Sequence, residues 1–384
     1  MASVKEIFSI LEMRDLAKTK IPQVMFDYLD GSAEDELTFE WNRNSFSRYE
    51  FVPRTLKDVS KVDLSTTFQG VDIDIPVISA PTGMSRMFHW EGEKAVVRAT
   101  HKAGTAYSLS TVSTTSIEDI AKESEGPLFF QIYAWHNKEM VKDFIERSRQ
   151  NNYKGLMLAV DLAALGKRDR DLRNGHGRPA VLRKNTALGA LSKPAWLFNF
   201  LTKPKMRMAN MVEHLPHGAD ALKVVDTVNA QFRADVTWDD AKEMMDQWNG
   251  EFMLKGIQCV DDAVKAAELG VSGIILSNHG GRQLDGAPAA MDILPEVVAA
   301  VGDKVEVFVD GGITRGSDII KAIALGAKGC LIGRAYLYGL AAGGEDGVAR
   351  VYEILKDEMY RTMQLIGCRS IDELDASYVR KHVQ

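Results

Sequence analysis

The chain has 384 residues, a formal net charge of -6 and a charged-residue content of 26%. This acidic balance argues against nucleic-acid binding, and no window approaches the roughly 20 apolar residues of a membrane-spanning helix. Cys259, Cys330 and Cys368 lack metal-ligand spacing, and the N-terminal residues lack the apolar core of a signal peptide. The sequence therefore predicts a reduced, cytoplasmic protein without a metal site.

In chain order, residues 1–70 predict helices and loops, with a helix starting at the proline of IPQVMFDYLDG. Residues 71–384 then repeat a short apolar run, a polar loop and a helical segment. The eight runs are IPVISAP (75–81), TAYSLST (105–111), LFFQIY (128–133), GLMLAVD (155–161), EFMLKG (251–256), GIILSN (273–278), VEVFVDGG (305–312) and GCLIGR (329–334). Alternating strands and helices imply parallel pairing, so residues 1–384 predict one domain, a (β/α)8 TIM barrel with an N-terminal helical extension. A doubly wound open sheet is the alternative, but neither G-x-G-x-x-G nor a Walker A motif is present.

A long insertion, about residues 175–240, separates the fourth and fifth runs and is too long for one crossover. Within it, residues 190–211 mix large apolar side chains with basic ones: Trp196, Leu197, Phe198, Phe200 and Leu201 beside Lys193, Lys203, Lys205 and Arg207. This pattern fits peripheral contact with an anionic membrane surface. The alternative is a lid that packs on the barrel or on another subunit.

The ends of the eight runs are polar, although the runs themselves are apolar. Barrel enzymes build their active sites at the C-terminal ends of the strands. Here those positions hold Pro81, Thr82, Gly83, Ser110, Gln131, Tyr133, Asp161, Lys255, Ser277, His279, Arg282, Asp310, Gly311, Gly312, Gly333 and Arg334. A purely structural barrel has no need of Gln, Lys, His, Asp and Arg side chains at one mouth, so the list predicts an active site.

Glycines follow strands seven and eight, where barrel enzymes often bind phosphate. Their backbone N–H groups can approach an anion, and Arg334 could pair with it bidentately. Lys255 would need an anionic partner at the barrel mouth, and the N1/O2 edge of a reduced flavin is a candidate. Ser110 and Gln131 could then hydrogen-bond other polar atoms of the flavin ring.

The segment LSNHGGRQLDGAP, together with APTG, FFQIY, LKG, DGG and LGAKGCLIGRAYLYG, closely resembles the FMN-dependent L-2-hydroxy acid oxidases and dehydrogenases. The resemblance spans nearly the whole chain. Within the family, the segments PTG, SLST and GRAYLYGLAAGGEDGV look most like the bacterial L-lactate dehydrogenases that pass electrons to quinones or cytochromes. The resemblance implies FMN as cofactor, L-lactate as substrate, a homo-tetramer, and a place in the cytoplasm or on the inner face of the cell membrane.

The resemblance also implies roles for single residues. His279 would be the catalytic base and Asp161 would orient its imidazole. Tyr28, Tyr133, Arg168 and Arg282 would bind the substrate, with Tyr133 also acting in catalysis. The isoalloxazine ring would be held by Pro81, Thr82, Gly83, Ser110, Gln131, Lys255 and Ser277, and the ribityl phosphate by Asp310, Gly311, Gly312, Gly333 and Arg334.

Four positions bear on how this chain differs from its relatives. Ala159 stands where the family commonly has a threonine that touches the flavin, and Thr314 stands where it commonly has an arginine near the phosphate, so we predict weaker retention of FMN. Val112 stands where glycolate oxidases carry a tryptophan, which leaves room for an acid larger than glycolate. Gly83 stands where oxidases often have alanine, which favours a dehydrogenase.

Other functions fit parts of the pattern. Within the family, the chain could be an oxidase that makes H2O2 from O2, or an L-mandelate dehydrogenase. From another class, a non-redox phosphate-binding lyase or isomerase could use Lys255 as a Schiff-base nucleophile, but this leaves Gln131, His279 and Arg282 without a role. A catalytically inactive scaffold is a third alternative, and the intact set of His279, Asp161 and Arg282 argues against it.

Overall fold

The computed structural model describes residues 3–175, 184–214 and 230–382. Eight parallel strands close into a barrel in the order β10-β11-β4-β5-β6-β7-β8-β9. They are β4 (Val77–Ser79), β5 (Tyr107–Ser110), β6 (Leu128–Ile132), β7 (Gly155–Ala159), β8 (Glu251–Ile257), β9 (Gly273–Leu276), β10 (Glu306–Asp310) and β11 (Gly329–Ile332). Each overlaps one of the eight predicted apolar runs. The predicted TIM barrel is confirmed, and the open sheet is excluded.

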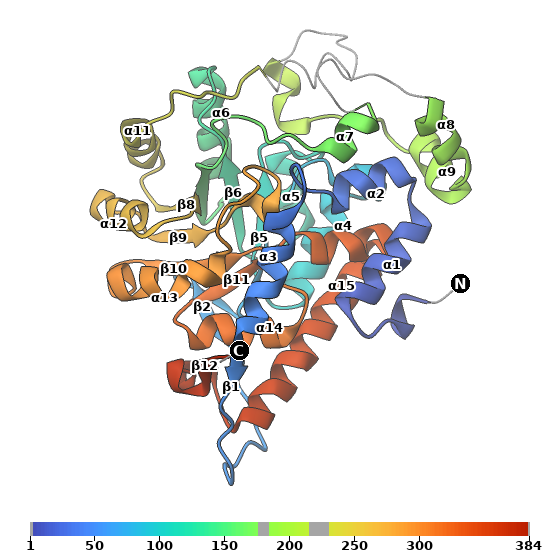
Figure 1. Ribbon diagram of the computed structural model, residues 1–384. Helices are drawn as coiled ribbons and strands as arrows, with labels where there is room; N and C mark the ends of the chain where they lie inside the picture. The colour runs from blue at the N-terminus through green and yellow to red at the C-terminus, as the bar shows by residue number, and fades with distance from the viewer. Residues whose placement is uncertain (1–2, 176–183, 215–229, 383–384) are drawn as a thin grey trace.

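Helices surround these strands, as Figure 1 shows. They are α4 (Glu93–Lys102), α5 (Ile117–Glu123), α6 (Lys138–Gln150), α11 (Trp238–Trp248), α12 (Val260–Leu269), α13 (Ala290–Val301), α14 (Gly316–Ala324) and α15 (Arg334–Ile366). Each turns apolar side chains to the barrel; in α14, for example, Ile319, Ile320 and Ile323 are buried. The long α15 is interrupted by non-helical backbone at Gly343 and Gly344.

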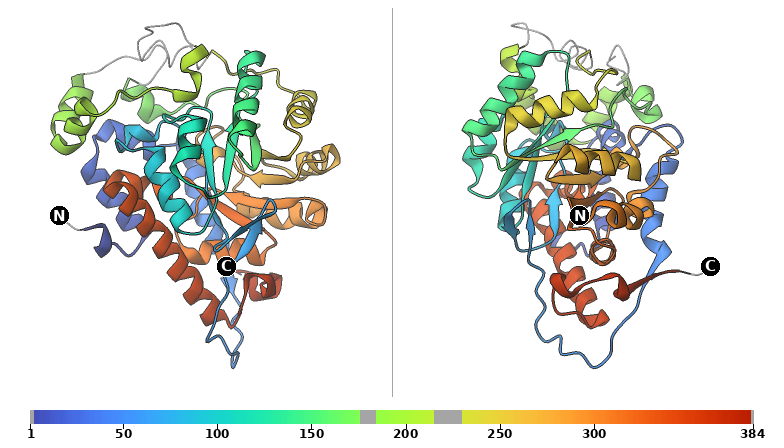
Figure 2. Two further views of the ribbon diagram at one scale, coloured as in Figure 1. Left: turned by 180° about the vertical axis from the view of Figure 1, so that it is seen from behind. Right: turned by 90° about the vertical axis from the view of Figure 1, so that its left-hand side faces the viewer.

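The N-terminal extension carries α1 (Ile10–Lys20), α2 (Gln23–Asp30) and α3 (Leu37–Ser45). Two short antiparallel pairs were not predicted: β1 (Tyr49–Phe51) with β12 (Val379–Lys381), and β2 (Thr66–Phe68) with β3 (Val71–Ile73). Figures 1 and 2 show β1 and β12 near the C-terminal end of α15. Single turns of 3-10 helix complete the chain: η1 (Val4–Glu6), η2 (Phe46–Arg48), η3 (Ser85–Met87), η5 (His279–Gly281), η6 (Ile371–Glu373) and η7 (Ala376–Tyr378).

After the fourth barrel strand comes α7 (Asp169–Arg173), and the insertion that follows it forms α8 (Lys184–Leu191), α9 (Pro194–Thr202) and η4 (Ala209–His214). The rest of the predicted insertion, at 176–183 and 215–229, lies outside the described residues. Figures 1 and 2 show α8 and α9 at the outer edge of the molecule, beside α1 and α2. Within the described ranges, no helix is both long enough and apolar enough to cross a membrane.

The β2–β3 hairpin closes the end of the barrel at which the strands begin. Phe68, fully buried, meets the rings of Phe129 and Phe308 edge-on at centroid distances of 4.6 and 4.8 Å. The hairpin is fixed there by Gln69, whose side chain donates to the Ser272 carbonyl and to Glu306. Edge-to-face aromatic packing of this kind adds to the free energy gained by burial. The polar site can therefore form only at the opposite mouth.

We predict that Phe68→Ala lowers the free energy of unfolding by about 3–5 kcal/mol, because it leaves a cavity against the two buried rings of Phe129 and Phe308. Urea denaturation measures the change. Leu365→Ala is the control, since Leu365 is 73% exposed and its loss should cost under about 0.5 kcal/mol. Equal stabilities for the two variants would contradict this account of the hairpin.

Candidate active site

A cavity of about 1120 Å³ opens at the C-terminal ends of the barrel strands. Of the predicted site residues, it is lined by Tyr28, Pro81, Thr82, Gly83, Ser110, Tyr133, Arg168, Lys255, His279, Arg282, Asp310, Gly311, Gly312, Gly333 and Arg334. The three others hydrogen-bond to lining residues: Asp161 to His279, Gln131 to Ser110, and Ser277 to Lys255. The structure thus brings the predicted residues together, while their individual roles stay predictions.

His279 and Asp161 form the first pair of the site. The Nδ1 atom of His279 lies 3.1 Å from both carboxylate oxygens of Asp161, which leaves Nε2 for a ligand in the cavity. Burial alone would raise the pKa of Asp161, but the charge and hydrogen bond of His279, with the charge of Lys255, hold it below its ordinary value. His279 has a φ of 59°, a left-handed conformation that costs a non-glycine residue free energy and is common at functional sites.

Two arginines flank the ring of Tyr28. The guanidinium of Arg282 lies 5.0 Å from the ring centroid and that of Arg168 lies 5.8 Å from it. Burial, and then the positive charge of Arg168, lower the pKa of Arg282 to about 10, so it remains charged at neutral pH. Arg168 is paired with Asp171 at 3.0 Å, whereas Arg282 has no carboxylate partner among the described residues. The desolvated charge of Arg282 therefore predicts an anionic ligand, and a planar carboxylate suits a guanidinium best.

Tyr133 lies close to these charged groups. Its ring stacks on Trp135 at a centroid distance of 6.0 Å and meets Phe232 edge-on. Burial, and then the negative charge of Asp161, raise the pKa of Tyr133 well above its ordinary value. The hydroxyl therefore stays protonated, and it makes no hydrogen bond within the described part of the chain, so it can donate one to a ligand.

Lys255 is buried between two neighbours on the following strands. Its Nζ donates to Ser277 Oγ at 3.0 Å and pairs with the carboxylate of Asp310, which also accepts from Ser277 Oγ at 2.8 Å. From the sequence, a flavin is expected as the anionic partner of Lys255, and Asp310 is expected at the phosphate. The structure supplies Asp310 as the partner, because a buried ammonium without a counter-charge is costly.

Ser110 and Gln131 are both buried at the ends of β5 and β6. The hydroxyl of Ser110 donates to Gln131 Oε1 at 2.9 Å, which fixes the orientation of the amide. The Nε2 atom of Gln131 is buried and has no hydrogen-bond partner among the described residues. Because a buried N–H without a partner is costly, this amide predicts a ligand with an acceptor atom.

The far end of the cavity has the backbone features of an anion site. Gly311 and Gly312 have φ values of 106° and 79°, which favour glycine. Helix α15 begins directly after Gly333 without a side-chain cap, so its first N–H groups remain open to an anion.

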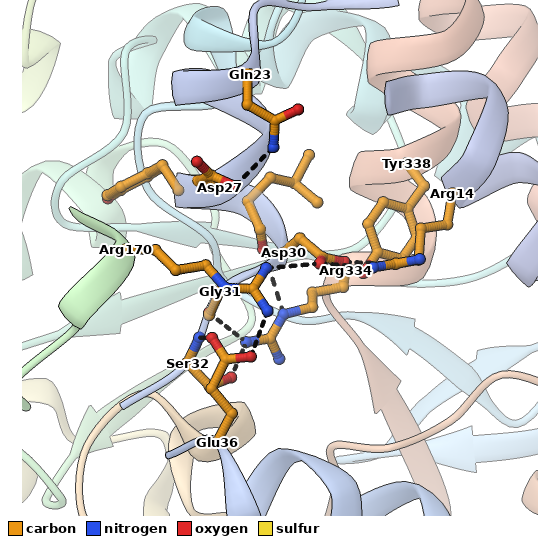
Figure 3. A network of polar contacts seen from close by, with 12 residues as sticks. Arg14, Gln23, Asp27, Asp30, Gly31, Ser32, Glu36, Arg170, Arg334 and Tyr338 are labelled. Carbon is orange, nitrogen blue, oxygen red and sulfur yellow. Dashed lines mark hydrogen bonds and ion pairs between the residues drawn. The ribbon is translucent and has the colours of Figure 1, made fainter. Parts of the chain in front are cut away.

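The guanidinium of Arg334 already has partners within the protein, as Figure 3 shows in part. Its guanidinium donates to the carbonyls of Leu29, Gly31 and Gly280 at 3.2, 2.8 and 2.8 Å, and to Ser32 Oγ at 2.8 Å. Bidentate pairing with a phosphate would break these bonds. Its side chain therefore anchors the N-terminal extension, and its backbone N–H remains for the anion.

Three positions at which the chain differs from the family pattern are Ala159, Thr314 and Gly83. Ala159 is buried outside the cavity lining, whereas Thr314 lies in it. Arg315 pairs with Glu358 on α15 and does not take the place of the arginine absent at 314. A Cβ atom at Gly83 would lie 2.5 Å from Val112 Cγ2, so close packing alone explains this glycine.

Sequence reasoning missed the contribution of the N-terminal extension. Arg14, Phe39 and Arg43 also line the cavity, and Asp30 beside them is buried in a network of ion pairs. These residues stand outside the strand ends, and no local pattern showed where their helices would dock. Within the described ranges, no group of His, Cys, Asp and Glu is arranged to hold a metal ion.

Comparison with known proteins agrees with this geometry. The family model for FMN-dependent dehydrogenases matches residues 17–381. A putative L-lactate dehydrogenase of Mycobacterium tuberculosis is 41% identical over 97% of this chain and 88% of its own length. Glycolate oxidase 3 of Arabidopsis thaliana is 39% identical over 98% of this chain and 96% of its own. The crystal structure of the monotopic membrane protein (S)-mandelate dehydrogenase superposes with a TM-score of 0.93, at 36% identity, covering 98% of this chain and 100% of that one.

We predict that Arg282→Leu weakens binding of a small carboxylate about 10- to 100-fold, because it removes a charge-assisted contact. The rise of the melting temperature with carboxylate concentration measures the affinity. Arg168→Leu should weaken binding as well, and this variant leaves the carbonyl contacts of Arg282 intact. Arg361→Leu, on the exposed face of α15, is the control. Unchanged affinity in both site variants would show that the anion binds elsewhere.

Proposed function

The chain belongs to the FMN-dependent dehydrogenase family and oxidises 2-hydroxy acids with FMN, and from this we propose that it is an L-lactate dehydrogenase that passes electrons to a membrane quinone. The observation that carries the proposal is the convergence of a base, His279 with Asp161, and a carboxylate anchor, Arg282 with Arg168, on one cavity.

The residues at the cavity fit FMN. The unpartnered amide of Gln131 matches a flavin ring, whose edge carries acceptor atoms. The uncapped start of α15, beside Gly311 and Gly312, matches a phosphate. Lys255 would bring positive charge to the pyrimidine edge of the ring, and the Oδ1 atom of Asp310, which has no partner among the described residues, would accept from a ribityl hydroxyl. When bound, FMN supplies a two-electron acceptor.

The protein's own groups would manage the proton and the carboxylate. Oxidation breaks the O–H and Cα–H bonds of the hydroxy acid and forms the C=O bond of the keto acid. One hydrogen would leave as a proton to the base, and the other, with two electrons, would pass to the cofactor. His279 would take a proton at Nε2, and Asp161 would stabilise the resulting imidazolium. Arg282 and Arg168 would hold the carboxylate, while the hydroxyls of Tyr133 and Tyr28 would orient the substrate.

L-Lactate is the substrate we favour. Apolar side chains line the cavity near these groups, among them Met87, Phe88, Val112 and Leu165. They suit a methyl group, and Val112 leaves more room than glycolate needs. Mandelate is the second candidate, because the same apolar lining could hold a phenyl ring and a mandelate dehydrogenase is structurally similar.

The insertion supports a membrane acceptor. Phe198 and Leu201 on α9 are 64% and 71% exposed, and Leu188 and Leu191 on α8 are exposed as well. Pairs three residues apart share one helix face, so these side chains form an apolar surface. Phe200 lines the active-site cavity and is also half-exposed, which brings this surface next to the site. The similar (S)-mandelate dehydrogenase is a monotopic membrane protein, which supports membrane contact, and residues 190–211 are the segment that we propose makes it.

The first test is an anaerobic mixing experiment with the FMN-loaded protein and L-lactate. We expect the visible flavin colour to bleach, and to return slowly in air if the protein is a dehydrogenase. Asp161→Asn should slow bleaching about 10²- to 10⁴-fold, because the imidazolium loses its counter-charge. Asp357→Asn, on the exposed face of α15, should leave the rate unchanged. Bleaching with mandelate but not with lactate would make mandelate the substrate in place of lactate. A rapid return of colour in air would identify an oxidase.

The second test addresses the membrane. We expect the protein to sediment with vesicles that contain anionic lipid, and Phe198→Ser/Leu201→Ser to lower the bound fraction without changing activity toward a water-soluble acceptor. Leu365→Ser removes an equally exposed leucine elsewhere and should leave binding intact. A wild-type protein that stays in the supernatant at low salt would refute the membrane acceptor.

The homo-tetramer and the location in the cell stay predictions. Analytical sedimentation checks the first, and cell fractionation checks the second.

A further inference from the structure

A phosphate bound at the end of the cavity lined by Gly311 and Gly312 would need a cationic side chain with free donors, and the residues predicted from the sequence do not supply one. A phosphate monoester carries about -1.5 to -2 charges at neutral pH. The guanidinium of Arg334 donates hydrogen bonds to Leu29, Gly31, Ser32 and Gly280, and Figure 3 shows its contacts with Gly31 and Ser32. Arg315 is paired with Glu358 outside the cavity, and position 314 is a neutral threonine.

Arg43, in the last turn of α3, lies against the glycines of this end. A Cβ atom built on Gly312 would lie 2.2 Å from the carbonyl oxygen of Asn42 and 3.0 Å from the backbone nitrogen of Arg43. The backbone of Arg43 is therefore in direct contact with the glycine loop. The same loop reaches Arg334, since Gly311 contacts Gly280, which in turn contacts the Arg334 guanidinium.

The position of α3 is fixed independently of Arg43. The side-chain amides of Asn42 and Asn278 exchange two hydrogen bonds, each 2.8 Å long, in a buried setting. Asp285 caps the start of the same helix by accepting from the backbone N–H groups of Leu37 and Thr38. Because both ends of α3 are held, the Arg43 side chain starts from a defined place beside the glycine loop.

The side chain of Arg43 is available for a ligand. It lines the same cavity as Gly311, Gly312 and Thr314. It makes no hydrogen bond or ion pair within residues 3–175, 184–214 and 230–382, whereas Arg14, the other arginine from the extension in this cavity, is paired with Asp30. An unpaired guanidinium facing a cavity suits a phosphate, which it can bind bidentately.

We propose that Arg43 binds the phosphate of FMN and takes the place of the arginine that is absent at position 314. The proposal rests on the membership of the FMN-dependent family. It makes the N-terminal extension part of the cofactor site. Retention of FMN would then depend on a residue outside the barrel.

Titration of the apoprotein with FMN and with riboflavin, followed by flavin fluorescence, tests the proposal. Arg43→Gln should weaken FMN binding about 10- to 100-fold and leave riboflavin binding unchanged, because riboflavin lacks the phosphate. The FMN affinity of Arg43→Lys should lie between those of the wild type and Arg43→Gln. The double variant Arg43→Gln/Thr314→Arg should recover the wild-type FMN affinity. Arg361→Gln is the control for a surface charge.

The FMN and riboflavin titrations distinguish a loss of phosphate binding from a general effect on the fold. An equal loss for FMN and riboflavin would mean that Arg43 only supports the fold, and no loss for either would mean that it does not meet the phosphate; both overturn the proposal. The melting temperature of the apoprotein checks that the variant is folded. A wild-type protein that binds FMN but is not bleached by any 2-hydroxy acid would instead refute the proposed function and leave the Arg43 result standing.

Discussion

The carbonyl oxygen of Gly31 accepts a hydrogen bond from each of the two buried arginines of the site, at 2.8 Å from Arg282 and 2.8 Å from Arg334. Both guanidiniums are desolvated, and neither could stay in the site without such acceptors. Gly31 itself has little freedom, because a Cβ atom there would lie 2.5 Å from the Asp27 carbonyl. One backbone carbonyl of the N-terminal extension thus holds the substrate end and the phosphate end of the cavity together.

Asp30 fixes the loop that carries this carbonyl. It is 1% exposed, and its carboxylate binds Arg14 of α1, Arg170 of α7 and Tyr338 of α15, as the network in Figure 3 shows. Burial would raise the pKa of Asp30, but Arg14 above all, with Tyr338 and Arg334, holds it below its ordinary value. Helix α1 of the extension, α7 and α15 of the barrel meet at one ionised carboxylate, and this is why the barrel alone would not complete the site.

The sequence predicted the parts of the molecule that repeat a local pattern. The eight apolar runs became the eight strands, and the polar residues that end them, such as Lys255 and His279, line one mouth because parallel strands all end on the same side. It could not predict pairings between elements whose docking has no local signal. The pair of Lys255 with Asp310, the carbonyl contacts of Arg334, and the place of Arg43 against Gly312 all depend on how separate segments pack. The pairing of β1 with β12 joins residues 49–51 to residues 379–381, which are far apart in sequence, and three-residue strands carry too little periodicity to be recognised.

The loop at residues 278–282 connects these interactions to the chemistry. His279, Gly280 and Gly281 have positive φ, and the loop keeps this backbone because each end is held: Asn278 by Asn42 of α3, and Arg282 by the carbonyls of Tyr28 and Gly31. Its Gly280 carbonyl binds Arg334 at the phosphate end, while His279 faces Asp161 at the substrate end. A shift of the extension would therefore move the base and the carboxylate anchor at the same time. In the proposed function, the groups that would bind the cofactor phosphate, hold the substrate carboxylate and take the proton all depend on one short loop held between the barrel and the N-terminal helices.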